Sequence, residues 1–225
     1  MIMERHFQHE LEGLKTMLVK MGSIVEGNVN AALKGLFEQT QSTVDEVIRS
    51  DERVNSLEIE IDNAIVDILA LHQPVASDLR LIIAAQKINN DLERIGDHAV
   101  NIAESARSFL QKSSTTEFLD LPQMAEIAKT MLRDTLDSFI HLDPNLARTV
   151  LERDDRIDDL NRAMTTKVIE LIRNGKGQIE DGLELIRVSR NLERVADLST
   201  NIAEEVIFHT QARVVKHHAE ERGES

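Results

Sequence analysis

Apolar residues recur along the first half of the chain at alternating steps of three and four, which is typical of amphipathic helices that pack against one another. The first such face starts at Phe7 and predicts a helix of about 30 residues. A second face starts at Val44, after the capping residues 40–43, and Pro74 marks its end. A third runs from about 75 to 110. Three long helices joined by short turns predict one antiparallel bundle.

The same pattern restarts after the polar stretch 112–117. It predicts a fourth helix over 124–141, a turn at Pro144, a fifth helix over 146–173 and a sixth that starts near 178–181. We therefore expect an all-α fold of six long helices, arranged as two tandem three-helix antiparallel bundles. The first repeat would span 1–112, the second 113–212, and 213–225 would form a polar tail.

Two stretches of the chain occur twice, in the same order. Residues 90–104 return at 190–204 with eight of fifteen positions identical, and 51–57 align with 154–160 at an offset of 103. Such self-similarity at a fixed period indicates internal duplication, so we expect the two halves to share one fold.

Four polar residues are kept in both copies, although the apolar positions between them have changed. On a helical wheel they fall within a stripe of about 80°, opposite the apolar face that includes Leu92 and Ile95. Core packing therefore does not explain why they were kept. They are Glu93, Asp97, Asn101 and Glu104 in the first copy, and Glu193, Asp197, Asn201 and Glu204 in the second.

Composition narrows the chemistry that these residues can perform. The net charge is −14 and the pI is near 5.0, which disfavours binding to a nucleic-acid backbone. There is no cysteine, so any metal would be held by carboxylate, histidine or amide oxygen. No run of 18 apolar residues exists and the N-terminus lacks the features of a signal peptide, so we expect a cytoplasmic protein.

Paired acidic residues at helical spacing are the strongest candidate for a metal site. Glu93 and Asp97 lie one turn apart on a helix, as do Glu193 and Asp197, so each pair can reach one cation. Glu58 and Asp62 on the second predicted helix have the same spacing. Oxygen ligands of this kind suit Mg, Mn, Ca or Fe and can also hold Zn.

The second half departs from this acidic pattern, because Asn161 and Thr165 stand where the first half has Glu58 and Asp62. We therefore expect a second site that is poorer in charge. The alternative for either half is a solvated acidic helix face that pairs with arginines such as Arg94 and Arg107. His98 has no counterpart in the second copy, which has Leu198, and we interpret it as an ordinary surface or boundary histidine.

The segments LERIGDHAVNIAE at 92–104, LERVADLSTNIAE at 192–204 and RHFQHEL at 5–11 resemble the PhoU family of phosphate-signalling accessory proteins, over about residues 3–210. The resemblance implies two three-helix repeats that carry metal ions or small metal clusters, with Fe, Zn, Mg or Mn as candidates. The implied ligands are Glu58, Asp62, Glu93, Asp97 and Asn101 in the first repeat, and Glu193, Asp197 and Asn201 in the second.

The resemblance also implies a function, which is negative regulation of phosphate uptake and of phosphate-starvation signalling. The expected partners are the ATPase subunit of a phosphate ABC importer, a phosphate-sensing histidine kinase and a second copy of the chain. Contact with the membrane would be through partners only. We expect no enzymatic activity. The alternatives are a metal-independent helical adaptor that docks a basic partner surface through the acidic stripe, a metal-dependent phosphoester hydrolase and a metal-storage protein.

Overall fold

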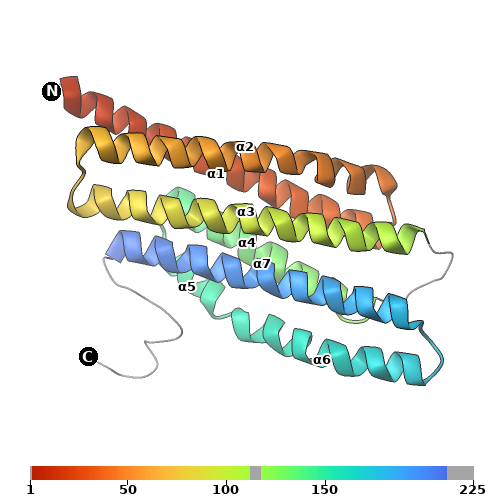
Figure 1. Cartoon of the computed structure of the whole chain (residues 1–225). Coiled ribbons are helices and arrows are strands. Elements are labelled where there is room, and N and C mark those ends of the chain that lie inside the picture. The colour runs from red at the N-terminus through yellow and green to blue at the C-terminus, as the bar shows by residue number, and fades with distance from the viewer. Residues whose placement is uncertain (1, 112–117, 212–225) are drawn as a thin grey trace.

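The computed structural model describes residues 2–111 and 118–211, and these ranges contain seven helices (Figure 1). Pro74 lies in the turn between the second and third helices, as predicted. The expected segment boundary at 112 and the expected polar tail 213–225 lie outside the described residues. The helices are α1 (Ile2–Phe37), α2 (Gln41–His72), α3 (Ala76–Leu110), α4 (Leu121–His141), α5 (Pro144–Leu151), α6 (Asp154–Arg173) and α7 (Ile179–Gln211).

The helices form two three-helix bundles that are joined side by side, which confirms the predicted all-α fold with an internal repeat (Figure 1). α1, α2 and α3 make the first bundle, and α4, α7 and the α5–α6 pair make the second. α3 and α7 run antiparallel in the middle of the molecule. Lys87 near the start of α3 contacts Glu205 near the end of α7, whereas Arg187 near the start of α7 contacts Glu104 near the end of α3.

One continuous apolar core runs through both bundles. The positions that repeat at three and four residues in the sequence are buried, including Leu18 and Met21 on α1 and the paired residues Ile95 and Val195 on α3 and α7. Complete burial of a side chain of this size contributes about 1.5–3 kcal/mol to stability. Because the core crosses the α3–α7 contact, the two repeats form one packed body rather than two independent domains.

The second helix of the second repeat differs from the expectation, because the predicted helix over 146–173 is divided into α5 and α6. The amide of Arg153 bonds the carbonyl of Val150, three residues back, at 3.1 Å, so the helix tightens and ends there. The guanidinium of Arg153 then holds the turn against α4 through Asp134 at 2.5 Å. As a result Asp154 lies at the N-terminus of α6, where the helix dipole favours a carboxylate.

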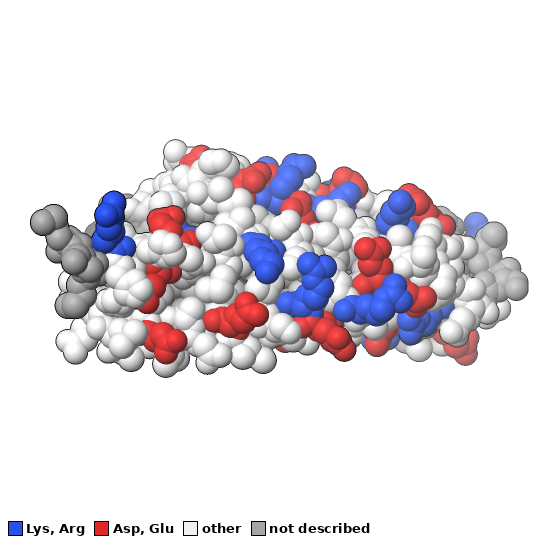
Figure 2. All heavy atoms as spheres, turned by 90° about the horizontal axis from the view of Figure 1, so that it is seen from above, with Lys and Arg blue, Asp and Glu red and all other residues white. Residues whose placement is uncertain are grey.

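The surface carries both signs of charge. On the face shown in Figure 2, acidic and basic side chains are interspersed. Among the described helices, none has a long enough apolar stretch to cross a membrane.

A buried carboxylate lies where α3 packs against α7. Asp91 is only 7 % exposed and is close to Lys87, Arg94 and Glu205. Burial raises the pKa of Asp91 to about 6; Arg94 opposes the rise and Glu205 adds to it. The second repeat has the neutral Asn191 at the corresponding position.

Replacing Asp91 by Asn should therefore stabilise the protein at high pH. The folded pKa lies above the ordinary value of 3.8, so stability falls as pH rises from 3.8 to about 6, and the loss is complete above that range. No cost exists at a pH where the acid is neutral in both states. We expect Asp91→Asn to raise the free energy of unfolding by roughly 1–2 kcal/mol at pH 8, with the gain shrinking toward pH 5. Urea unfolding followed by circular dichroism at both pH values measures it.

The exposed Asp67 on α2 provides the matched control. Asp67→Asn should change stability by no more than about 0.5 kcal/mol at either pH. A gain in Asp91→Asn that is the same at pH 5 and pH 8 would contradict a cost of charging.

Candidate metal centres between paired helices

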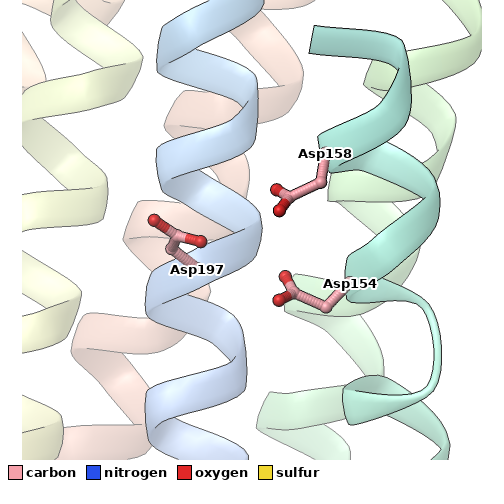
Figure 3. Close-up of side chains that lie close together, drawn as sticks. All are labelled: Asp154, Asp158 and Asp197. Atoms are coloured by element: carbon pink, nitrogen blue, oxygen red, sulfur yellow. The ribbon is translucent and has the colours of Figure 1, made fainter. Parts of the chain in front are cut away.

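Three aspartates converge in the groove between α6 and α7 (Figure 3). Asp154 and Asp158 lie one turn apart on α6 and point toward Asp197, which projects from α7. One carboxylate oxygen of each lies within 4.8 Å of the others, and all three side chains are half-buried. Three oxygens this close, on two helices, can hold a single hard cation.

Local packing fixes this geometry. Ile157 and Leu160 on α6 and Val195 on α7 are buried in the core, and the half-buried aspartates lie at the edge of this contact between the two helices. Glu193 lies one turn before Asp197 on α7 and extends the carboxylate set. The guanidinium of Arg194 contacts two of these carboxylates. It donates a hydrogen bond to Asp197 Oδ2 at 2.6 Å and lies 3.5 Å from Glu193 Oε2.

The electrostatics of this groove favour a cation. Burial raises the pKa of Glu193, and the nearby charges of Asp197 and Asp158 raise it further. Burial also raises the pKa of Asp197; Arg194 opposes this rise and Asp158 adds to it. Carboxylates that are partly desolvated and placed side by side repel one another, and a bound cation would remove that repulsion.

The first repeat builds a related groove between α2 and α3. Glu58 on α2 and Glu93 on α3 both have raised pKa values, with burial as the first cause and neighbouring carboxylates, including Asp97, as the second. Burial raises the pKa of Asp51 as well, and Asp97 adds to the rise. Glu58, Glu93, Asp97 and Asp51 therefore act on one another electrostatically, although they come from two helices.

Asp51 provides the clearest test of whether this groove suits a metal. Its Oδ2 accepts a hydrogen bond of 3.1 Å from Asn55, which occupies the position of Asp158 in the other repeat. Its Oδ1 is buried and finds no hydrogen-bond partner among the described residues. A buried carboxylate oxygen without a donor costs stability, so it fits a ligand position for a hard cation.

The remaining sequence-predicted ligands lie at the edges of these grooves. Asp62 Oδ1 accepts hydrogen bonds from Asn89 at 2.8 Å and from Gln86 at 2.9 Å. Asn101 Oδ1 accepts a bond of 3.1 Å from Arg187, and Asn201 is exposed one turn beyond Asp197. Of the predicted ligands, Asp197 thus belongs to a close carboxylate group, and Glu58, Glu93 and Asp97 act on one another electrostatically. The amides of Asn89 and Gln86 hold Asp62, and Asn101 contacts an arginine.

Sequence reasoning missed Asp51, Asp154 and Asp158. The expectation of a second site poorer in charge stays a prediction, but that site has two carboxylates, Asp154 and Asp158, which the sequence reasoning did not count. The sequence did contain a signal for two of these residues: the aligned segments 51–57 and 154–160 both begin with aspartate, Asp51 in one and Asp154 in the other. Asn161 instead accepts a hydrogen bond of 2.8 Å from Ser189.

His98, the neighbour of Asp97, joins the two repeats. Its Nδ1 lies 2.9 Å from Asn191 Oδ1 on α7, and burial lowers its pKa. This position agrees with its interpretation as a boundary histidine.

The internal repeat is also found in other proteins. A profile of the PhoU domain matches residues 18–106 and 121–206. The chain is 36 % identical to a phosphate-specific transport system accessory protein PhoU homolog of Aquifex aeolicus, over 96 % of this chain and 98 % of that protein. It is 35 % identical to the homolog of Pseudomonas putida, over 95 % and 84 %.

Solved structures agree with this relationship. The crystal structure of PhoU from Pseudomonas aeruginosa superposes with a TM-score of 0.89 at 33 % identity, covering 92 % of this chain and all of that one. A phosphate transport system regulatory protein PhoU from Streptococcus pneumoniae superposes with a TM-score of 0.86 at 27 % identity, covering 94 % and 100 %. With both repeats matched in sequence and in fold, the chain belongs to the PhoU family of phosphate transport accessory proteins.

Proposed function

We propose that this protein is a metal-binding negative regulator of phosphate uptake and of phosphate-starvation signalling. Its relatives are named as accessory proteins of the phosphate-specific transport system, and one solved relative is named as a regulatory protein of phosphate transport. The observation that carries the metal part of the proposal is the convergence of Asp154, Asp158 and Asp197 between two packed helices.

Two sets of residues would hold the metal. In the second repeat these are Asp154, Asp158, Glu193 and Asp197, and in the first repeat they are Asp51, Glu58, Glu93 and Asp97. Fe, Mn, Mg and Zn all accept such oxygen donors. A bound cation would neutralise the carboxylates and offer coordination positions to an acidic group. Arg194 would have to leave Asp197, which its 56 % exposed side chain allows at little cost.

The names of the relatives support a role beside the phosphate transport system, and the acidic grooves offer surfaces for a partner. The protein would act in the cytoplasm, where it meets the ATPase subunit of the phosphate importer and the histidine kinase that reports phosphate supply. With phosphate plentiful, it would hold the kinase in its repressing state and restrain uptake. It would work as an adaptor without turnover of its own, as a homodimer that reaches the membrane only through these partners.

A second candidate is a metal-independent adaptor that binds a basic partner surface. Arg194 favours it, because its guanidinium already bonds Asp197 in the way that an arginine of a partner would. Binding by charge alone would weaken steeply with salt and would not respond to a chelator, since exposed ion pairs are screened.

Asparagine in place of Asp154, Asp158 and Asp197 should remove metal from the second repeat only. Asparagine keeps the shape of each side chain and removes the charge that attracts a cation. We expect elemental analysis of the purified variant to show about half the metal of the wild type, since the first groove stays intact. A chelator should lower the stability of wild type by roughly 1–3 kcal/mol, and that of the variant by less.

The exposed Glu126 on α4, which pairs with Lys129, provides a control distant from both grooves. Glu126→Gln should leave metal content unchanged. Equal metal content in the wild type and in the triple variant would exclude the second groove as a metal site.

Partner recovery should depend on both acidic grooves. We expect tagged wild-type protein, captured from its own cells at high phosphate, to bring down the importer ATPase or the histidine kinase. The variant Glu93→Ala, Asp97→Ala, Glu193→Ala and Asp197→Ala should recover several-fold less, because it lacks the charges that a metal or a basic surface would use. Mass spectrometry of the eluates at high and low phosphate measures this.

Two further conditions separate the two candidate functions. Loss of the partner with chelator supports the metal-binding regulator, and loss with salt but not with chelator supports the metal-independent adaptor. Recovery of neither partner by wild type would contradict the phosphate-signalling assignment.

A further inference from the structure

A basic cleft opens beside the second acidic groove, between the C-terminal half of α3, α6 and the first turns of α7. This open cleft has a volume of about 490 Å³, a size common for small-molecule sites. Figure 1 shows these three helices together at the end of the molecule where α6 turns into α7. The lining residues are Asn101, Thr165, Leu183, Ile186, Arg187, Arg190 and Asn191.

Two arginines on one face of α7 define the chemistry of the cleft. Arg187 and Arg190 are three residues apart, so their guanidinium groups can reach a single ligand. Arg187 is held in position by Glu104 at 2.8 Å and Asn101 at 3.1 Å, whereas Arg190 has no ion pair with any residue of the described ranges. Glu104 does not line the cleft, and its ion pair is half exposed. An entering anion can therefore compete with it at small cost.

Neutral donors complete the arrangement. The Oδ1 of Asn101 is occupied by Arg187, while its Nδ2 bonds no other group in the described chain and can donate to an anion. Thr165, whose hydroxyl is a further donor, lines the same cleft from α6. Leu183, which is 63 % exposed, and Ile186 provide an apolar side next to these polar groups. A charged head and an apolar body would both find contacts here.

At three positions that line the cleft, the second repeat is more positive than the first. Thr165 stands where the first repeat has Asp62, Arg190 where it has Asn90, and Asn191 where it has Asp91. Each of these three differences makes the second repeat more positive by one unit, in a chain whose net charge is −14. In the neighbouring groove, Glu193 and Asp197 were kept over the same duplication.

We infer that the cleft between α3, α6 and α7 binds a small molecule that carries a phosphate group, with Arg187 and Arg190 as its principal ligands. Guanidinium groups match phosphate oxygens in geometry, and two of them balance a charge between one and two negative units. The volume and the apolar side favour an organic phosphate ester over the free ion. This site is separate from the metal centres and does not rest on the proposed function.

The test is calorimetric titration of the full chain with three probes: adenosine monophosphate, glycerol 3-phosphate and inorganic phosphate. The double variant Thr165→Asp with Arg190→Asn gives the cleft the residues of the first repeat at both positions. We expect it to weaken binding of the preferred probe by about 10- to 100-fold, through the loss of one charge-assisted contact and the added repulsion. Lys34→Asn, an exposed charge removal on α1, should bind like wild type.

Each titration is done on chelator-treated and on metal-loaded protein. Tighter binding of the esters identifies an organic phosphate as the ligand, and equal binding of inorganic phosphate identifies the phosphate group alone; both support the cleft. Binding that requires metal and is unchanged in the double variant would overturn the inference, because the anion would then be a metal ligand. Binding of none of the probes at up to about 10 mM would also overturn it.

Metal content and circular dichroism of the double variant keep this test independent of the metal centres. Both should equal those of wild type, since neither residue belongs to the proposed ligand sets. A failure of the phosphate site with normal metal content leaves the proposed function standing, and the reverse holds for the metal variants.

Discussion

The antiparallel packing of α3 against α7 is the constraint on which the rest of this molecule depends. Each of these helices uses one face for the core of its own bundle, where Ile95 and Val195 are completely buried. Another face contacts the opposite repeat, through pairs such as Lys87 with Glu205 and His98 with Asn191. The face that remains carries the repeated carboxylates, so the same packing that joins the repeats fixes the direction of both acidic grooves.

This arrangement holds the carboxylates closer together than they would lie if they were fully exposed to solvent. The pKa values of Glu93 and Glu193 are raised because burial and neighbouring carboxylates both disfavour their ionised forms. Such a site lowers stability, and a continuous core of aliphatic side chains can offset that loss. Strained electrostatics of this kind are more common at binding sites than on ordinary solvated surfaces.

Duplication allowed the two halves to diverge without a change of fold. α2 runs unbroken for 32 residues, whereas its counterpart breaks into α5 and α6 at Arg153, which places Asp154 at a helix N-terminus. The second groove thereby gains a tight group of three aspartates, and the first has Asn55 hydrogen-bonded to Asp51 instead. The two grooves are related in position but not in ligand geometry, so they need not bind the same ion with the same affinity.

The sequence by itself determined the repeat, the face on which the acidic residues lie and the helices, except for the break that divides α5 from α6. These features depend on periodicity along a single helix, which is a local property of the chain: Leu92 and Ile95 must point away from Glu93 and Asp97 in any α-helix. Only the tertiary structure decided which residue of one helix meets which residue of the next. Helix periodicity does not specify the axial register between α6 and α7, and that register brings Asp154 and Asp158 to Asp197. The same register places Asn161 against Ser189, whereas the packing of α3 against α7 places Asn101 against Arg187.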